Sequence, residues 1–158
     1  MRIVLAGLDG SGKTTLARLL LTNALSEHCP TERVRFDKLI VMKTPLTLID
    51  SSGDGDFGRQ WLEYDCEAFI FVVDGTDRSR LGEVEIELKK LFVKKKPIAI
   101  LFNKSDLVSF CPVSELTRSL NLETFNTENL PPLQGFECSV TKGLGFQEAL
   151  NWLVSAAK

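Results

Sequence analysis

The sequence lacks a disulfide framework, a zinc motif and a strong net charge. Its four cysteines are scattered at Cys29, Cys66, Cys111 and Cys138 with no Cys-x-x-Cys pair, which favours reduced thiols in a cytosolic protein. The 19 basic and 21 acidic residues give a net charge of −2, so the overall charge attracts neither nucleic acid nor an acidic membrane surface. Binding partners must therefore be selected by local features.

Histidine and long apolar runs are also scarce. The one histidine, His28, lies beside Cys29 in a polar stretch, and such a pair is too few ligands for a zinc site. No apolar run approaches the roughly 20 residues of a membrane-spanning helix, and neither a signal peptide nor a Met-Gly start is evident. We expect a single domain over residues 1–158, a cytoplasmic monomer that reaches a membrane only through a segment absent from these residues.

One stretch near the start carries a specific motif. Residues 7–14 read Gly-Leu-Asp-Gly-Ser-Gly-Lys-Thr, which matches G-x-x-x-x-G-K-[ST], and an apolar run precedes it while a helical pattern follows. This strand–loop–helix context indicates a phosphate-binding P-loop, in which backbone N–H groups and the helix start surround the phosphates. Lys13 would reach the β- and γ-phosphates and Thr14 would bind Mg²⁺. The alternative is a glycine-rich turn that only caps a helix. The predicted phosphate-binding residues are Asp9, Gly10, Ser11, Gly12, Lys13, Thr14 and Thr15.

Apolar runs alternate with helical patterns along the rest of the chain. This alternation predicts an α/β fold with a doubly wound, mostly parallel sheet of six strands and one antiparallel edge strand, formed by residues 34–42. Ligands of such sheets bind at the carboxyl ends of the strands. The expected strands are 1–6, 34–42, 45–49, 68–73, 98–102 and 133–137, and the expected helices are 13–26, 59–64, 79–93, 112–120 and 145–157, with 121–132 irregular.

A P-loop alone does not identify its nucleotide, and this one would equally suit a nucleoside monophosphate kinase of the thymidylate type. Residues 103–106, Asn-Lys-Ser-Asp, favour guanine, because a carboxylate can accept from both its N1–H and its 2-amino group, which adenine lacks. Asp106 is then the base reader. Asn103 would bond N7 or tie neighbouring loops together, the Lys104 stem would cover one face of the base, and the Ser139 N–H could donate to O6. The predicted base-binding residues are Asn103, Lys104, Asp106, Cys138, Ser139 and Val140.

Together these motifs resemble a small GTPase, and within that superfamily the Arf and Arf-like branch. The likeness covers nearly the whole chain and includes Gly7-Leu8-Asp9, Val72-Val73-Asp74 with Asp77-Arg78, and Asn151-Trp152-Leu153. It implies a Ras-like G domain of the P-loop NTPase type that binds GTP and GDP with Mg²⁺. It further implies that Thr31 contacts Mg²⁺ and the γ-phosphate, that Asp50 orients Mg²⁺ through water, and that the Gly53 N–H senses the γ-phosphate. Loss of that phosphate would release both loops, which is the switch.

The resemblance also implies partners and a cellular role. Effectors, exchange factors and activating proteins would bind near residues 31–64, in membrane trafficking or in ciliary or organelle transport. The chain departs from the family there, because Arg33 and Ser52 replace glycines. At the three positions where the family shows an aromatic cluster to its partners, the chain has Val34, Ile49 and Tyr64, of which only Tyr64 is aromatic. We therefore expect different partners.

A further departure concerns catalysis. Most Arf-like proteins have a glutamine after Gly53 that orients the attacking water, and Asp54 stands there instead. Its carboxylate is shorter and would lie beside anionic phosphate oxygens. From a catalytic set of Lys13, Thr31, Gly53 and Asp54 we therefore expect slow or negligible hydrolysis. The exceptions would be a different loop fold in which Arg59 or Gln60 substitutes, or an activating protein that adds an arginine.

Two rival functions stay open. One is a non-hydrolysing adaptor like the β-subunit of the signal recognition particle receptor, which residues 46–50 loosely resemble. The other is a phosphotransferase, which needs a second substrate site and an arginine-rich lid that the sequence does not show. Outside the motifs, Trp61 could face a partner or pin the second switch loop, and Trp152 is expected in the core. The lysines between 89 and 96 complement the negative end of their helix or touch an acidic membrane or partner.

Overall fold

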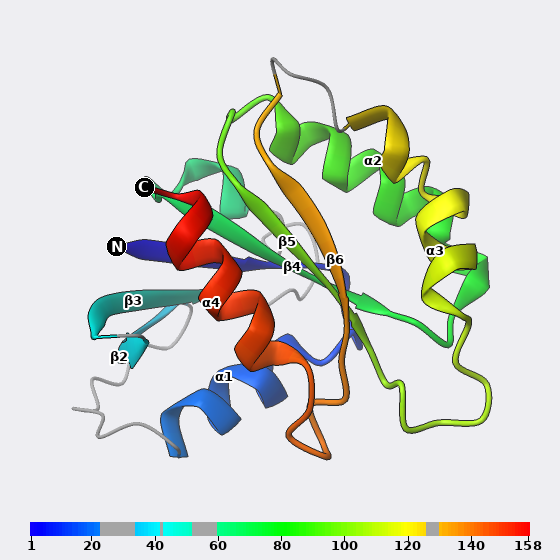
Figure 1. Ribbon diagram of the computed structural model, residues 1–158, viewed down its shortest axis with the longest axis horizontal. Helices are drawn as coiled ribbons and strands as arrows, with labels where there is room; N and C mark the ends of the chain where they lie inside the picture. The colour runs from blue at the N-terminus through cyan, green and yellow to red at the C-terminus, as the bar shows by residue number, and fades with distance from the viewer. Residues whose placement is uncertain (23–33, 42, 52–59, 126–129) are drawn as a thin grey trace.

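The computed structural model describes residues 1–22, 34–41, 43–51, 60–125 and 130–158. A six-stranded sheet in the order β2-β3-β1-β4-β5-β6 lies at its centre (Figure 1). The edge strand β2 pairs antiparallel with β3, and the other neighbouring strands pair in parallel. This is the predicted sheet, with its one antiparallel edge strand. The strands are β1 (Arg2–Ala6), β2 (Val34–Val41), β3 (Thr44–Ser51), β4 (Ala68–Asp74), β5 (Ile98–Asn103) and β6 (Leu133–Glu137).

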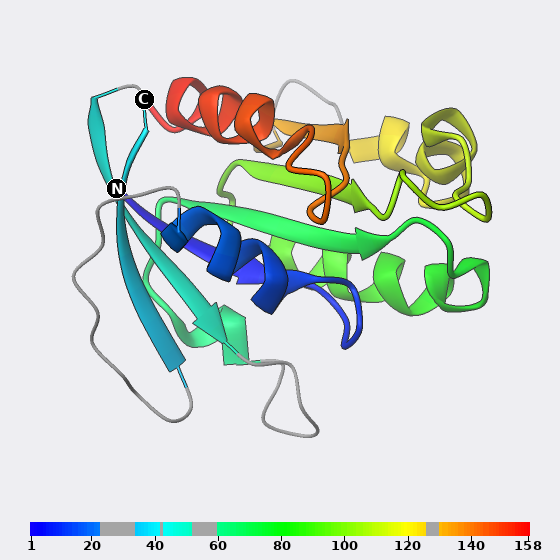
Figure 2. The same ribbon diagram turned by 90° about the horizontal axis from the view of Figure 1, so that it is seen from below.

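Helices cover both faces of the sheet, because successive strand residues point to opposite faces. In β1, Ile3 and Leu5 pack in one core with helices α1 and α4, whereas Val4 and Ala6 pack in a second core with α2 and α3. Figures 1 and 2 show both termini at the end of the sheet where β1 starts. The helices are α1 (Lys13–Thr22), α2 (Leu81–Phe92), α3 (Val113–Ser119) and α4 (Phe146–Ala156).

The structure differs from the expected element bounds mainly at helix ends. The helix expected from residue 79 begins as the 3-10 turn η3 (Arg78–Arg80), because the Asp77 carboxylate accepts from the Ser79 N–H at 3.1 Å. The stretch expected to be irregular contains another 3-10 turn, η4 (Leu122–Phe125). The part of the first predicted helix beyond Thr22 lies outside the described residues.

The two tryptophans have different surroundings. The 3-10 helix η2 (Gln60–Glu63) directs Trp61 into the core, where it is 1% exposed and meets Phe71 edge-on at a centroid distance of 6.4 Å. This burial excludes a partner-facing Trp61 in this structure and shows that the side chain anchors η2 to the sheet. Trp152 is half-buried and packs on Phe136.

The three described cysteines form no disulfide bonds. Cys66, Cys111 and Cys138 are buried free thiols, and burial raises the pKa of Cys138 to about 12.

On α2, Lys89 and Lys90 form ion pairs with glutamates about one turn earlier. In the described part of the chain, no helix is both long enough and apolar enough to cross a membrane.

Candidate functional site

The P-loop joins β1 to α1 at the carboxyl end of the sheet. Its three glycines have positive φ angles of 135° at Gly7, 72° at Gly10 and 104° at Gly12, a region that other residues rarely adopt. The Lys13 ammonium folds back over the loop and donates to the Leu8 carbonyl at 2.7 Å. The backbone therefore has the tight curl that the sequence pattern predicted.

This loop fits a polyphosphate group in two further respects. Helix α1 begins at Lys13, so the positive end of its dipole and its first N–H groups lie at the loop. Ser11 is 1% exposed, and its hydroxyl has no hydrogen-bond partner among the described residues. Buried hydroxyls normally find a partner in a protein's functional state. Backbone shape, helix dipole and this hydroxyl together suit an anionic ligand.

Asn103 connects the P-loop to the loop after β6. The residue ends β5 and is 3% exposed. Its side-chain nitrogen donates to the Ser11 carbonyl at 2.8 Å, and its side-chain oxygen accepts from the Val140 N–H at 3.0 Å. Of the two roles predicted for Asn103, the structure shows the one that ties neighbouring loops together.

Asp106 lies in an exposed position three residues beyond β5 and is held from the neighbouring loop. The Ser139 hydroxyl donates to its carboxylate at 2.6 Å, and the Thr141 hydroxyl lies 3.4 Å from the other carboxylate oxygen. The Ser139 hydrogen bond lowers the pKa of Asp106 below its ordinary value. Asp106 is therefore ionised at neutral pH and oriented, which is the state that can accept two hydrogen bonds from guanine.

The backbone of the loop after β6 differs from the prediction. The Ser139 N–H, expected to donate to the base carbonyl, donates to the Leu144 carbonyl at 3.1 Å. The Val140 N–H is taken up by Asn103, and Cys138 accepts from the Ser105 N–H at 3.1 Å through its carbonyl. Ser139 thus contacts Asp106 through its hydroxyl, while its N–H closes a turn within the same loop.

Lys104 is fixed by Asp74, a residue at the end of β4 for which the sequence predicted no role. The Lys104 ammonium binds the Asp74 carboxylate, and Thr76 donates to the same carboxylate from its backbone and its hydroxyl, at 2.9 and 2.6 Å. Burial acts to raise the pKa of Asp74, but the hydrogen bonds from Lys104 and Thr76 outweigh it and the pKa falls. These contacts restrain the lysine stem that was expected to cover the base.

Two of the three predicted magnesium ligands lie at the carboxyl end of the sheet. Thr14 is exposed in the first turn of α1, and Asp50, near the end of β3, is 7% exposed. Among the described residues no group of three or more His, Cys, Asp or Glu could hold a metal ion. Hydroxyl and single-carboxylate donors fit Mg²⁺, which is bound through few protein groups together with substrate phosphates.

The remaining predicted residues fall outside the described ranges. These are the third magnesium ligand and the expected catalytic positions, Thr31, Gly53 and Asp54. The neighbouring departures from the family pattern, Arg33 and Ser52, fall outside them as well, and so do His28 and Cys29.

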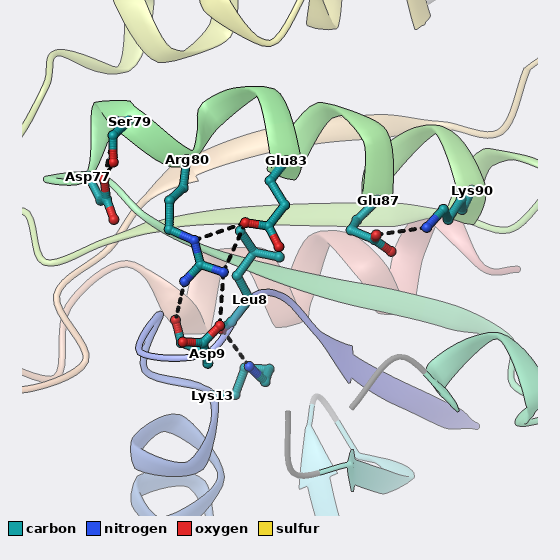
Figure 3. Close-up of polar contacts among 9 residues, drawn as sticks. All are labelled: Leu8, Asp9, Lys13, Asp77, Ser79, Arg80, Glu83, Glu87 and Lys90. Atoms are coloured by element: carbon teal, nitrogen blue, oxygen red, sulfur yellow. Dashed lines mark hydrogen bonds and ion pairs between the residues drawn. The ribbon is translucent and has the colours of Figure 1, made fainter. Parts of the chain in front are cut away.

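Arg80 is a contact of the P-loop that sequence reasoning missed. Its guanidinium extends from η3 to Asp9 (Figure 3), with 2.9 Å between a guanidinium nitrogen and the Asp9 carboxylate. The hydrogen bond and the charge of Arg80 lower the pKa of Asp9. No local pattern could have revealed this pair, because 71 residues separate its members.

Known proteins share this arrangement of sheet and loops, which is the Ras-like G domain fold. The Arl6 BBS3 small GTPase from Trypanosoma brucei, solved with the bound nucleotide analogue GppNp, superposes with a TM-score of 0.83 at 27% identity, covering 99% of this chain and 96% of that chain. ADP-ribosylation factor-like protein 3 of Caenorhabditis elegans is 32% identical over 165 residues, covering 100% of this chain and 88% of the relative. ADP-ribosylation factor F of Dictyostelium discoideum is 31% identical, covering 98% and 84%.

The family is shown by a match over nearly the full length. The sequence profile of the ADP-ribosylation factor family matches residues 1–157. The chain therefore belongs to the ADP-ribosylation factor family of small GTPases, and the predicted resemblance to its Arf and Arf-like branch is confirmed. Membership of this family makes the chain a GTP-binding switch protein.

Proposed function

We propose that residues 1–158 form a single G domain in which the P-loop holds the phosphates of GTP or GDP and Asp106 reads the guanine base. The observation that carries this proposal is the double contact of Asn103 with the Ser11 carbonyl and the Val140 N–H. This contact holds the phosphate loop and the base loop at one edge of the sheet. A nucleotide placed there would meet Lys13 at its phosphates and Asp106 at its base.

The chain's own residues then have distinct tasks. Lys13 and the P-loop N–H groups neutralise and orient the phosphates. Thr14 and Thr31 would supply oxygen ligands for Mg²⁺, and Asp50 would orient the ion through water. When bound, Mg²⁺ would neutralise phosphate charge. The Gly53 N–H would report the presence of the γ-phosphate to the effector region near residues 31–64.

Calorimetry with GTP, GDP, ATP and ITP in Mg²⁺ buffer tests this assignment. We expect GTP to bind at least about 100-fold more tightly than ATP, since adenine leaves the oriented Asp106 carboxylate without its two donors. ITP, which lacks the 2-amino group, should lie between them. Equal binding of ATP and GTP, or binding of neither, would contradict the proposed function.

Slow hydrolysis forms part of the proposal. Asp54 places a negative carboxylate where relatives have a neutral amide, and its repulsion from the anionic γ-phosphate disfavours the position from which the side chain would orient the attacking water. We expect single-turnover phosphate release to be slow in the wild type and to rise about tenfold or more in Asp54→Gln. Asp56→Asn, which removes a carboxylate from the same stretch, is the matched control and should leave the rate unchanged. Equal rates for wild type and Asp54→Gln would rule out this explanation.

A second candidate, a non-hydrolysing GTP-binding adaptor, is favoured by the same aspartate. In that case the purified protein would contain GTP and would show no turnover in either variant.

The positions that contact partners in the family also differ here, which favours different partners for this chain. Ile49 is 2% exposed and Tyr64 is half-buried, so of these two positions only the tyrosine is aromatic and partly accessible. A role in membrane trafficking or in ciliary or organelle transport, peripheral to a membrane, stays a prediction.

A further inference from the structure

Arg80 is shared between the P-loop and the start of α2. One of its terminal nitrogens lies 2.9 Å from the Asp9 carboxylate and 3.0 Å from that of Glu83, and the other lies 3.4 Å from the Asp9 carbonyl. Its Nε also donates to Glu83 at 3.0 Å. Figure 3 shows the guanidinium between the two acidic side chains. Glu83 therefore fixes the arginine, and the arginine holds both the side chain and the backbone of Asp9.

Asp9 presents an electrostatic problem for a loop that holds anions. It is the third residue of the P-loop and its side chain is 63% exposed, whereas that of Arg80 is 32% exposed. A carboxylate within a few ångströms of phosphate oxygens repels them, and this repulsion is largest at low ionic strength. The hydrogen bond and the charge of Arg80 lower the pKa of Asp9, so the arginine keeps this carboxylate ionised. Arg80 is also the cation that lies close enough, at 2.9 Å, to offset the repulsion.

We propose that Arg80 is a positioning residue for the polyphosphate of the bound nucleotide, which it serves by neutralising Asp9 and holding that carboxylate toward α2. The inference rests on the proposed nucleotide site and adds to it a residue from η3. Exposed ion pairs contribute little to folding stability. Loss of Arg80 is therefore expected to lower the affinity for nucleotide while leaving the unfolding temperature nearly unchanged.

The role predicts a specific dependence between two substitutions. In Arg80→Gln the unpaired Asp9 carboxylate can turn toward the phosphates, and we expect the affinity for GTP to fall about tenfold, and less for GDP because it carries less charge. In the Asp9→Asn background no carboxylate remains to be neutralised. There the same arginine substitution should cost less than about threefold.

The experiment measures dissociation constants of GTP and GDP by calorimetry, with Mg²⁺, for the wild type, Arg80→Gln, Asp9→Asn and the double variant, at about 50 and 500 mM salt. The Arg80→Gln penalty should shrink at high salt. Arg78→Gln is the matched control, because this neighbouring arginine pairs with Glu115 at 2.9 Å, away from the P-loop. Unfolding temperatures of all variants should agree within about 3 °C.

The outcomes separate the two claims. Absence of GTP and GDP binding in the wild type would overturn the proposed function and this inference with it. Binding in the wild type that Arg80→Gln leaves unchanged would overturn the inference alone. So would a loss of affinity that is the same with and without Asp9→Asn, because Arg80 would then act through folding of the turn and not through the charge of Asp9.

Discussion

Asp106→Asn is expected to change the preferred base from guanine to xanthine. The asparagine keeps one acceptor for N1–H but presents an amide N–H₂ where guanine carries its own amino group, so two donors face each other. Xanthine has a carbonyl at that position and can accept from the amide. We expect GDP affinity to fall by about 100-fold or more and XDP to become the tighter ligand. Competition between GDP and XDP for the protein in Mg²⁺ buffer measures this change in base preference.

Asp65→Asn provides the matched control for this substitution. Asp65 precedes β4, at the opposite end of that strand from the site, and its exposed carboxylate pairs with Arg2 on the surface. The control should keep the guanine preference. If Asp106→Asn also kept its preference for GDP over XDP, Asp106 would not be the base reader, and the hydrogen bond from Ser139 would have only a structural role.

Gly7→Ala is expected to cause the largest loss of stability in the P-loop. A Cβ at Gly7 would lie 2.3 Å from the carbonyl oxygen of Val72, an atom of the neighbouring central strand, and the φ angle of 135° is itself unfavourable for alanine. Because the backbone atoms of β4 have little freedom to move, the cost of the unfavourable φ angle and the cost of the steric clash add to each other. The free energy of unfolding should fall by about 3–5 kcal/mol. Urea denaturation without added nucleotide measures it.

Gly10→Ala separates backbone strain from the clash. Gly10 has a φ angle of 72°, but a Cβ there meets no atom within 4 Å. The cost should be only about 1–2 kcal/mol, that of a left-handed residue. Equal losses for the two variants would mean that the approach of Gly7 to β4 does not determine the stability of the loop.

Most of the fold could be predicted from local patterns. Continuous apolar runs placed β4 and β5, and the glycine spacing placed the P-loop, because both are set by residues close together in sequence. The same holds for Asn103, which ends a recognisable strand, and for Asp106, three residues further on. Where the order of elements and a local motif agree, the edge of the sheet that carries the site follows from general rules of parallel sheets.

The contacts that could not be predicted depend on distant residues or on competition between partners. Arg80 and Asp9 are far apart in the chain, and nothing in either neighbourhood selects the other. The Ser139 N–H was expected to face the base, but the Leu144 carbonyl on the other side of a tight turn binds it. The sequence allowed Trp61 either to face a partner or to pin the second switch loop. Only its packing against Phe71 in the folded structure distinguishes these two environments.

The single amide of Asn103 has a thermodynamic consequence. Because the same side chain contacts both the loop for the phosphates and the loop for the base, the two halves of a nucleotide do not meet independent subsites. Ordering of one loop reduces the entropy that the second loop must lose when it binds its part of the ligand. The intact nucleotide should therefore bind cooperatively, with an affinity that neither a nucleoside nor pyrophosphate would approach alone.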